Sequence, residues 1–137
     1  MSNNFIFVND KQVIIEHLQE IKDLLSQSYW ADKRSAEVVG KSIRNSSCYG
    51  IMDTTSNCLI GFGRVVTDYA TMFYLTDVII EKAYRNQGMG TKFVEYIVCE
   101  EGKNGLEYGI LFTEDAKDFY SSVGFKVCEE TGMVKRY

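Results

Sequence analysis

The sequence has no proline among its 137 residues and a single histidine, His17. Its four cysteines, Cys48, Cys58, Cys99 and Cys128, lie far apart, and none forms a C-x-x-C pair. Because zinc sites need closely spaced cysteine and histidine ligands, we expect no metal site. The four thiols are predicted to be reduced and mostly small core residues.

Long apolar runs and an excess of positive charge are also missing. No apolar stretch approaches the roughly 20 residues that cross a bilayer, and residues 1–10 lack the basic and apolar segments of a secretory signal. We therefore expect a cytoplasmic protein with no membrane partner. Lysine and arginine number 15 against 19 aspartates and glutamates, a net charge of −4. Nucleic-acid binding usually needs a basic surface, so no nucleic-acid partner is expected, whereas a cationic acceptor is compatible with this balance.

The composition and the apolar periodicity predict one folded domain over residues 1–137. The hydrophobic share is 45% and the charged share 25%, which is ordinary for a globular chain. Residues 4–8 predict a first strand, and apolar residues from Ile14 to Leu25 recur at helical spacing. Ser35 can cap a second helix, whose inward positions are predicted to be Val38, Val39 and Ile43.

The second half of the chain alternates between strands and helices. Three consecutive strands are predicted between residues 48 and 80, then a helix from about residue 91. A strand at 108–113, a short helix at 115–123 and strands at 124–129 and 133–137 follow. The order β-α-α-β-β-β-α-β-α-β-β predicts an α/β (α+β) fold with a mixed sheet covered by helices. The last strand could pair with a second copy in a homodimer.

The segment "YRNQGMGTKF" at 84–93 places two glycines where a helix should begin. A dinucleotide fingerprint and a Walker loop both fail, because Phe93 stands where each pattern requires glycine. What remains is a strand, a connector with R-x-x-G-x-G, and an amphipathic helix. Glycines let the backbone approach an anion, and the amides and dipole of a helix N-terminus favour negative charge. The segment predicts a diphosphate site, and the alternative is a tight turn without a ligand.

Two motifs in this part of the chain resemble the GNAT superfamily of N-acetyltransferases. Arg85, Gly88 and Gly90 match that family's acetyl-coenzyme A signature, Q/R-x-x-G-x-G/A. The stretch "DAKDFYSSVGF" at 115–125 is similar to the family's N-A-x-x-x-Y-x-x-x-G-F helix, with Asp115 in place of the asparagine. The resemblance implies a GNAT-like, mostly antiparallel twisted sheet with helices on both faces.

The resemblance also implies acetyl-CoA as co-substrate and a set of backbone contacts to it. Val78, Ile79 and Ile80 would hydrogen-bond the pantetheine arm, and Asp115 would stand where the family asparagine contacts that arm. Arg85 adds a cation for the pyrophosphate. The amides expected to hold the pyrophosphate are those of Asn86, Gln87, Gly88, Met89, Gly90 and Thr91.

Acetyl transfer needs a neutral amine, a donor to the carbonyl oxygen and a proton for the departing thiolate. Tyr120 occupies the position of the tyrosine that the family commonly uses as proton donor, and its alternative is core packing. The carbonyl donor is expected to be the amide of Val78 or Ile79. Asp77, a carboxylate in an apolar strand, could act as the base or could form a buried ion pair, for example with Arg64.

Acceptor recognition is expected in the connection "SQSYWADKRS" at 26–35. Tyr29 and Trp30 could cover the acceptor and Arg34 could bind a carboxylate on it, whereas Trp30 could instead pack between helices. The leading hypothesis is an acetyl-CoA-dependent N-acetyltransferase for a primary amine, by direct attack on the thioester. The compact length favours a small molecule. The alternatives are a non-catalytic acyl-CoA-binding module and a protein N-acetyltransferase.

Overall fold

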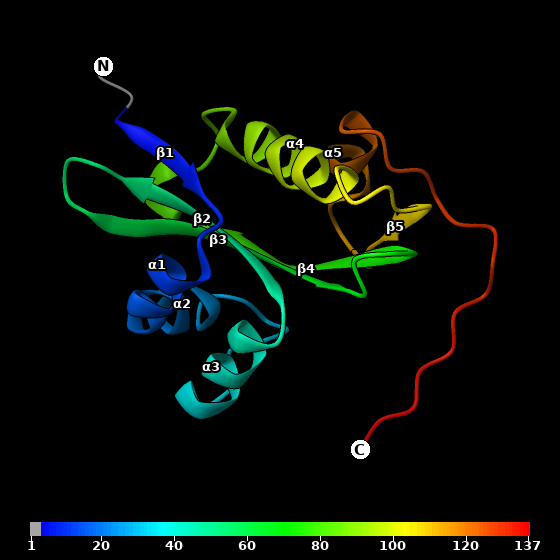
Figure 1. Ribbon diagram of the computed structural model, residues 1–137, viewed down its shortest axis with the longest axis horizontal. Coiled ribbons are helices and arrows are strands. Elements are labelled where there is room, and N and C mark those ends of the chain that lie inside the picture. The colour runs from blue at the N-terminus through cyan, green and yellow to red at the C-terminus, as the bar shows by residue number, and fades with distance from the viewer. Residues whose placement is uncertain (1–3) are drawn as a thin grey trace.

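A five-stranded sheet in the order β1-β2-β3-β4-β5 organises the computed structural model, which describes residues 4–137 (Figure 1). β1 to β4 pair antiparallel with their neighbours, and β5 joins β4 in parallel. The α/β class and the mixed, mostly antiparallel sheet are therefore confirmed. The strands are β1 (Phe5–Val8), β2 (Ser47–Asp53), β3 (Cys58–Thr67), β4 (Met72–Ile80) and β5 (Tyr108–Ile110).

Helices cover both faces of the sheet, as expected (Figure 1). On one face lie α1 (Lys11–Glu16), α2 (Leu18–Leu25) and α3 (Ala36–Arg44), which share a hydrophobic cluster with β2, β3 and β4. On the other lie α4 (Met89–Gly102) and α5 (Lys117–Ser122), against a second cluster. A short 3-10 helix, η1 (Lys82–Tyr84), connects β4 to the turn before α4.

Local chemistry sets the helix boundaries of the first half. The Asp10 carboxylate accepts the amides of Gln12 and Val13 and starts α1, and Ser35 caps α3 as predicted. The apolar stripe from residue 14 to residue 25 does not belong to one helix. His17 leaves helical geometry, with φ −104° and ψ 27°, and divides the stripe into α1 and α2. Val38, predicted to face inward, is 52% exposed.

Three of the four cysteines are not core residues. All four thiols are free, but Cys58, Cys99 and Cys128 are exposed and only Cys48 is buried. The prediction of mostly buried thiols is therefore wrong, because Cys99 lies on an exposed position of α4 and Cys128 in the carboxyl-terminal segment. Along residues 4–137, no helix combines the length and the apolarity needed to cross a bilayer.

A buried carboxylate joins the end of α4 to β2. Glu101 is 1% exposed, and its Oε2 accepts a hydrogen bond from Ser47 Oγ at 2.8 Å and another from the Tyr49 hydroxyl. Burial, together with this bond to Glu101, raises the pKa of Tyr49. The tyrosine therefore keeps its proton and remains a donor to the carboxylate.

The pairing of β4 with β5 depends on one glycine. A Cβ at Gly109 would lie 2.1 Å from the ring of Phe73, which is its partner in the β4–β5 register. Such a contact is impossible without displacing the ring. Gly109 therefore allows β5 to lie beside β4 at this position.

The two carboxyl-terminal strands predicted at 124–129 and 133–137 do not form in the single chain. Residues 125–137 carry no strand assignment; residues 125–128 and 130 line a cavity together with β5, and the end of the chain then runs away from the sheet (Figure 1). A strand requires a partner for its backbone groups. Met133 is 95% exposed and Val134 69%, so this segment does not pack on its own sheet.

Candidate active site

β4 and β5 diverge after only three paired residues. Met72–Tyr74 pair with Tyr108–Ile110, and β4 then continues to Ile80 with no strand beside it on that side among residues 4–137. Strand backbone without a neighbour offers unpaired N–H and C=O groups to a ligand. We call residues 75–80, on the side that faces away from β3, the free edge of β4.

A bulge interrupts β4 in the middle of this free edge. Phe62 pairs with Ile79 and Arg64 with Thr76, so Asp77 and Val78 both stand opposite the single residue Gly63. Asp77 has a φ of 56°, which is unusual for a residue other than glycine. A bulge re-aims side chains and releases backbone groups from the ladder. Here it turns the Asp77 side chain toward the α2–α3 connection and leaves Val78 unpaired with β3.

The Asp77 carboxylate is buried and accepts hydrogen bonds from three distant residues and, at 3.4 Å, from Oγ1 of its neighbour Thr76. Trp30 Nε1 donates to Oδ1 at 3.1 Å, and Arg34 Nη1 and Arg64 Nε donate to Oδ2 at 2.7 Å and 2.9 Å. Burial alone would raise the pKa of Asp77, but the bonds and charges of Arg64, and then of Arg34, hold it below its usual range. The carboxylate is therefore ionised and fully engaged. This is the ion-pair alternative, and it disfavours Asp77 as the base.

These hydrogen bonds give Trp30 and Arg34, which were expected to bind the acceptor, a structural role. Trp30 and Arg34 direct donors at Asp77 and so fasten the α2–α3 connection to the bulge. Tyr29 stays free for an acceptor: it is 63% exposed and its ring lies edge-on to Trp30, with the centroids 5.2 Å apart. Partial burial raises the pKa of Tyr29, and the charges of Glu114 and Asp115 add to this shift. The negative charges of Glu114 and Asp115, in the segment after β5, therefore act on Tyr29.

Glu114 is the residue that sequence reasoning missed. It precedes the motif that resembles the family pattern and falls in no periodic stretch. Its adjacency to Asp115 was the only signal for it. The relation between Glu114 and Tyr29 depends on the fold, because 85 positions of the chain separate the two residues.

The glycine turn begins α4 with the backbone that an anion site requires. Gly88 is the N-cap of α4 with a φ of 77°, and a Cβ there would meet no heavy atom within 4 Å. Gly90 does not have a positive φ, and a Cβ at this position would lie 3.6 Å from Ile80 and Phe119, which is an ordinary contact distance. The packing of the chain itself therefore does not require glycine at position 90. First-turn amides of an α-helix have no intrahelical partner, so those at the start of α4 are available to an anion.

Arg85 fastens the same turn to the end of β4. Its Nε donates to the Ile80 carbonyl oxygen at 2.7 Å. That carbonyl is therefore already engaged, whereas Val78 and Ile79 still contribute backbone to the free edge. The structure thus places the turn at 86–91 beside the end of β4, next to Ile80.

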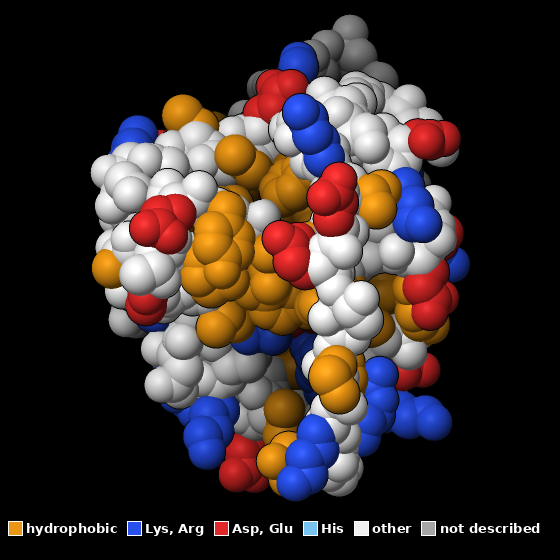
Figure 2. Space-filling model, turned by 90° about the vertical axis from the view of Figure 1, so that its right-hand side faces the viewer, with side chains coloured by type: hydrophobic (Ala, Val, Ile, Leu, Met, Phe, Trp, Pro, Cys, Tyr) orange, Lys and Arg blue, Asp and Glu red, His pale blue; other side chains and the backbone are white. Residues whose placement is uncertain are grey.

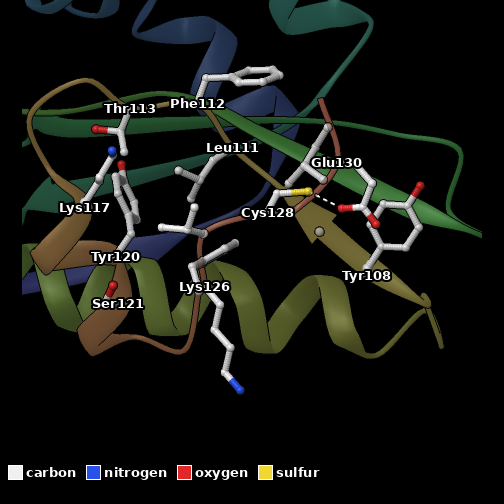
Figure 3. Close-up of a pocket in the computed structure, with 14 residues that line it drawn as sticks. Tyr108, Leu111, Phe112, Thr113, Lys117, Tyr120, Ser121, Lys126, Cys128 and Glu130 are labelled. Carbon is white, nitrogen blue, oxygen red and sulfur yellow. Dashed lines mark hydrogen bonds between the residues drawn. The ribbon is translucent and has the colours of Figure 1, made fainter. Parts of the chain in front are cut away.

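Tyr120 projects from α5 into a cavity of about 810 Å³ beside β5 (Figure 3). Its ring lies between those of Phe119 and Phe125, with centroid distances of 4.9 Å and 6.0 Å. Burial, and secondarily the charge of Asp115, raises the pKa of Tyr120. The hydroxyl therefore carries its proton at neutral pH, as a proton donor must, and the shift makes it a weaker acid than an ordinary tyrosine.

A protein-family model described as an acetyltransferase (GNAT) domain matches residues 44–127, which include the free edge, the glycine turn and Tyr120. The chain belongs to the GNAT family of acetyltransferases. It is 30% identical over 125 residues to an uncharacterized ycf52-like N-acetyltransferase of Prochlorococcus marinus, covering 88% of this chain and 67% of that protein. It is 28% identical over 75 residues to a thialysine Nε-acetyltransferase of Bos taurus, covering 49% of this chain and 44% of that enzyme.

Solved GNAT structures share the whole architecture. A GNAT-family structure from Xanthomonas campestris pv. campestris superposes with a TM-score of 0.86 at 26% identity, covering 100% of this chain and 95% of that one. GNAT proteins use acetyl-CoA as co-substrate and act on amines, so this chain is an N-acetyltransferase.

Proposed function

We propose that this GNAT protein transfers the acetyl group of acetyl-CoA to a primary amine of a small, cationic molecule. The free edge of β4 carries the proposal. Within 15 residues, this edge and the segment after it combine unpaired strand backbone, a bulge at Asp77 and Val78, and the start of a helix capped by glycine. A turn without a ligand would need the glycine at 88 but not the one at 90.

The part of the site that would bind the acetyl donor, acetyl-CoA, consists mainly of backbone groups. The amides of residues 86–91 would hold the pyrophosphate, and Val78 and Ile79 would bind the pantetheine arm. The coenzyme supplies an activated acetyl thioester when it is bound. The Val78 amide, unpaired with β3, would then donate to the carbonyl oxygen as negative charge develops there.

Tyr120 would supply the proton that the departing sulfur needs. Its raised pKa keeps the hydroxyl protonated at neutral pH. Lys117 and Thr113 line the same cavity (Figure 3). Proton transfer from a positioned side chain is worth about 10²–10⁴-fold in rate.

The part of the site that would bind the amine, the acetyl acceptor, contains acidic and aromatic side chains. Glu114 and Asp115 act on the exposed Tyr29 from the loop after β5. Carboxylates attract an ammonium group, and an aromatic face adds a cation–π contribution of about 0.5–1 kcal/mol at an exposed site. Since the carboxylate of Asp77 is occupied, the amine would lose its proton to water held in this acidic region. The relative from Bos taurus acts, by its name, on thialysine, which is itself a small amine.

A screen of small amines with acetyl-CoA, following release of the free thiol, tests the reaction. We expect turnover with primary amines of cationic molecules. For primary amines of molecules without a positive charge we expect kcat/KM to be more than tenfold lower. Binding of acetyl-CoA is measured separately by calorimetry on Gly90→Val, with Gly90→Ala as the matched control because the family motif accepts alanine. Loss of binding in the valine variant alone is expected. Normal binding by Gly90→Val would refute the pyrophosphate site, and binding without any turnover would favour an acyl-CoA-binding module.

A further inference from the structure

A cavity of about 810 Å³ lies beside β5, apart from the residues expected to bind acetyl-CoA. Its walls are residues 108–113, residues 125–128 with Glu130, and one side of α5 (Figure 3). It includes no residue of β4 or of the glycine turn, and of the residues assigned to the reaction only Tyr120 lines it. Pockets that hold small molecules usually measure about 300–1,000 Å³. We call this space the β5 cavity, and its size suits a small ligand.

The two long walls of the β5 cavity are apolar. Ile110 and Leu111 line it from β5 and the residue after it, and Phe125 and Val127 line it from the carboxyl-terminal segment. Figure 2 shows hydrophobic side chains gathered at the centre of this face, with a chain segment crossing in front of them. Contiguous apolar surface on a soluble protein often marks a place where a ligand or partner binds. The long walls would therefore hold the apolar body of a ligand.

Three hydrogen-bond donors of the lining lie together where α5 begins. Thr113 Oγ1 accepts the Ala116 amide at 3.0 Å, which holds this hydroxyl beside Lys117, the first residue of α5. The hydroxyl proton of Thr113 remains available to a ligand. Tyr120 follows Lys117 by three residues, so the two side chains share one side of the helix. In Figure 3 the polar ends of these three residues lie at the same end of the cavity, where they can donate to one anion.

The lining also carries an excess of positive charge. Lys117 and Lys126 both line the cavity, and neither forms an ion pair with another residue of the range 4–137. Among the same residues, Glu130 is the one carboxylate of the lining, and its Oε2 accepts a hydrogen bond from Cys128 Sγ at 2.6 Å. Two lysines against one carboxylate favour a negatively charged ligand over a positively charged one.

We propose that the β5 cavity binds a small organic carboxylate with an apolar body, of the chemical class of a medium-chain fatty acid. The carboxylate would accept hydrogen bonds from Lys117 and from the hydroxyls of Thr113 and Tyr120, and the apolar body would lie between the two long walls. A cavity with apolar walls and donors at one end matches a molecule that is apolar except for an anion at one end.

A bound carboxylate would also slow acetyl transfer. It would engage the Tyr120 hydroxyl, which the departing sulfur needs as its proton donor. This consequence rests on the proposed function of the protein, whereas the binding itself does not.

Calorimetric titration of the full chain with octanoate, at concentrations too low for micelles, tests the site. We expect octanoate to bind at least about tenfold more tightly than octylamine, which has the same apolar body and the opposite charge. Acetate, which has the charge without the apolar body, should also bind more weakly than octanoate. Equal affinities for octanoate and octylamine would show adsorption to apolar surface only and would overturn the proposal.

Two pairs of variants locate the bound octanoate. Val127→Asp adds a carboxylate at an exposed position of the lining and should abolish binding, whereas Val38→Asp, on an exposed valine of α3, should not. Lys117→Gln should weaken binding by about tenfold, and Lys41→Gln, at an exposed lysine of α3, should leave it unchanged. Unaltered binding by Val127→Asp and Lys117→Gln would place octanoate elsewhere and reject the site.

Titration in the presence of saturating coenzyme A separates the β5 cavity from the coenzyme site. We expect the affinity for octanoate to change by less than about threefold, because the two sites share only Tyr120. Displacement of octanoate by coenzyme A would make it an occupant of the coenzyme site and overturn the proposal. Full turnover with octanoate bound would exclude its contact with the Tyr120 hydroxyl. A chain that binds octanoate but not coenzyme A would contradict the proposed function and support the β5 cavity as a separate site.

Discussion

Replacing Asp77 by asparagine should destabilise the protein, because it leaves two arginines without a countercharge. Removing one partner of a buried ion pair costs about 3–5 kcal/mol. The side chains of Arg34 and Arg64 are 29% and 14% exposed, so water compensates in part, and the asparagine amide retains one acceptor oxygen. We therefore expect the lower end, about 3 kcal/mol of unfolding free energy.

This loss translates into a measurable change of melting temperature. An unfolding entropy of about 2.1 cal/mol/K per residue gives roughly 0.29 kcal/mol/K for 137 residues. A loss of about 3 kcal/mol then lowers Tm by about 10 °C. The measurement is urea and thermal unfolding followed by circular dichroism. The control is Lys103→Gln, which removes the 67%-exposed partner of Glu100 and should cost less than about 1 kcal/mol.

Kinetics of the same Asp77→Asn variant separate an organising role from a catalytic one. Loosening of the α2–α3 connection should raise KM for the amine and leave the pH profile of kcat unchanged. An Asp77→Asn protein as stable as the wild type, with kcat reduced more than a hundredfold and an altered pH profile, would refute this reasoning. It would restore Asp77 as the proton acceptor.

Three further predictions follow from the geometry of the site and the core. Tyr120→Phe should lower kcat by about 10²-fold and leave acetyl-CoA affinity within about twofold, measured by thiol release and calorimetry; unchanged turnover would remove Tyr120 from the reaction. Tyr49→Phe should cost about 1–3 kcal/mol in urea unfolding, because it takes a donor from the buried Glu101. The stability difference between wild type and Asp77→Asn should be constant above the pKa of about 3.9 of an unfolded aspartate, and should shrink as pH falls below it. The pKa of Asp77 is lower in the folded protein than in the unfolded chain, so its carboxylate stabilises the fold fully above the pKa of the unfolded aspartate. This stabilisation is lost as the pH falls through the pKa of Asp77 in the folded protein. A stability difference that instead grows in acid would contradict this prediction.

The sequence predicted the glycine turn before α4 better than it predicted the surroundings of Asp77. The turn from Arg85 to Thr91 is a local feature, and its glycines and the helix after it are contiguous in the chain, so periodicity and turn chemistry were sufficient. Three of the donors on Asp77 come from distant positions, 30, 34 and 64. Their convergence depends on a bulge and on a positive φ at a non-glycine residue, and neither has a reliable signature in sequence.

The carboxyl-terminal segment shows a different limit. Alternating apolar residues predict a strand at 133–137, but the pattern does not say which edge the strand will join, or on which copy. A strand is a property of two segments, whereas a helix such as α4 satisfies its own backbone. The break at His17 was missed for a related reason, since the apolar stripe continues through it.

The contact between Gly109 and the Phe73 ring limits how this enzyme could be adapted to longer acyl donors. The glycine holds the beginning of β5 against β4, so the divergence of the two strands starts at a fixed place. Any side chain at position 109 would have to displace the Phe73 ring or force the strands apart at their only paired section. Engineering of acyl-chain preference would therefore be most productive after Ile110, where β5 has already left its neighbour.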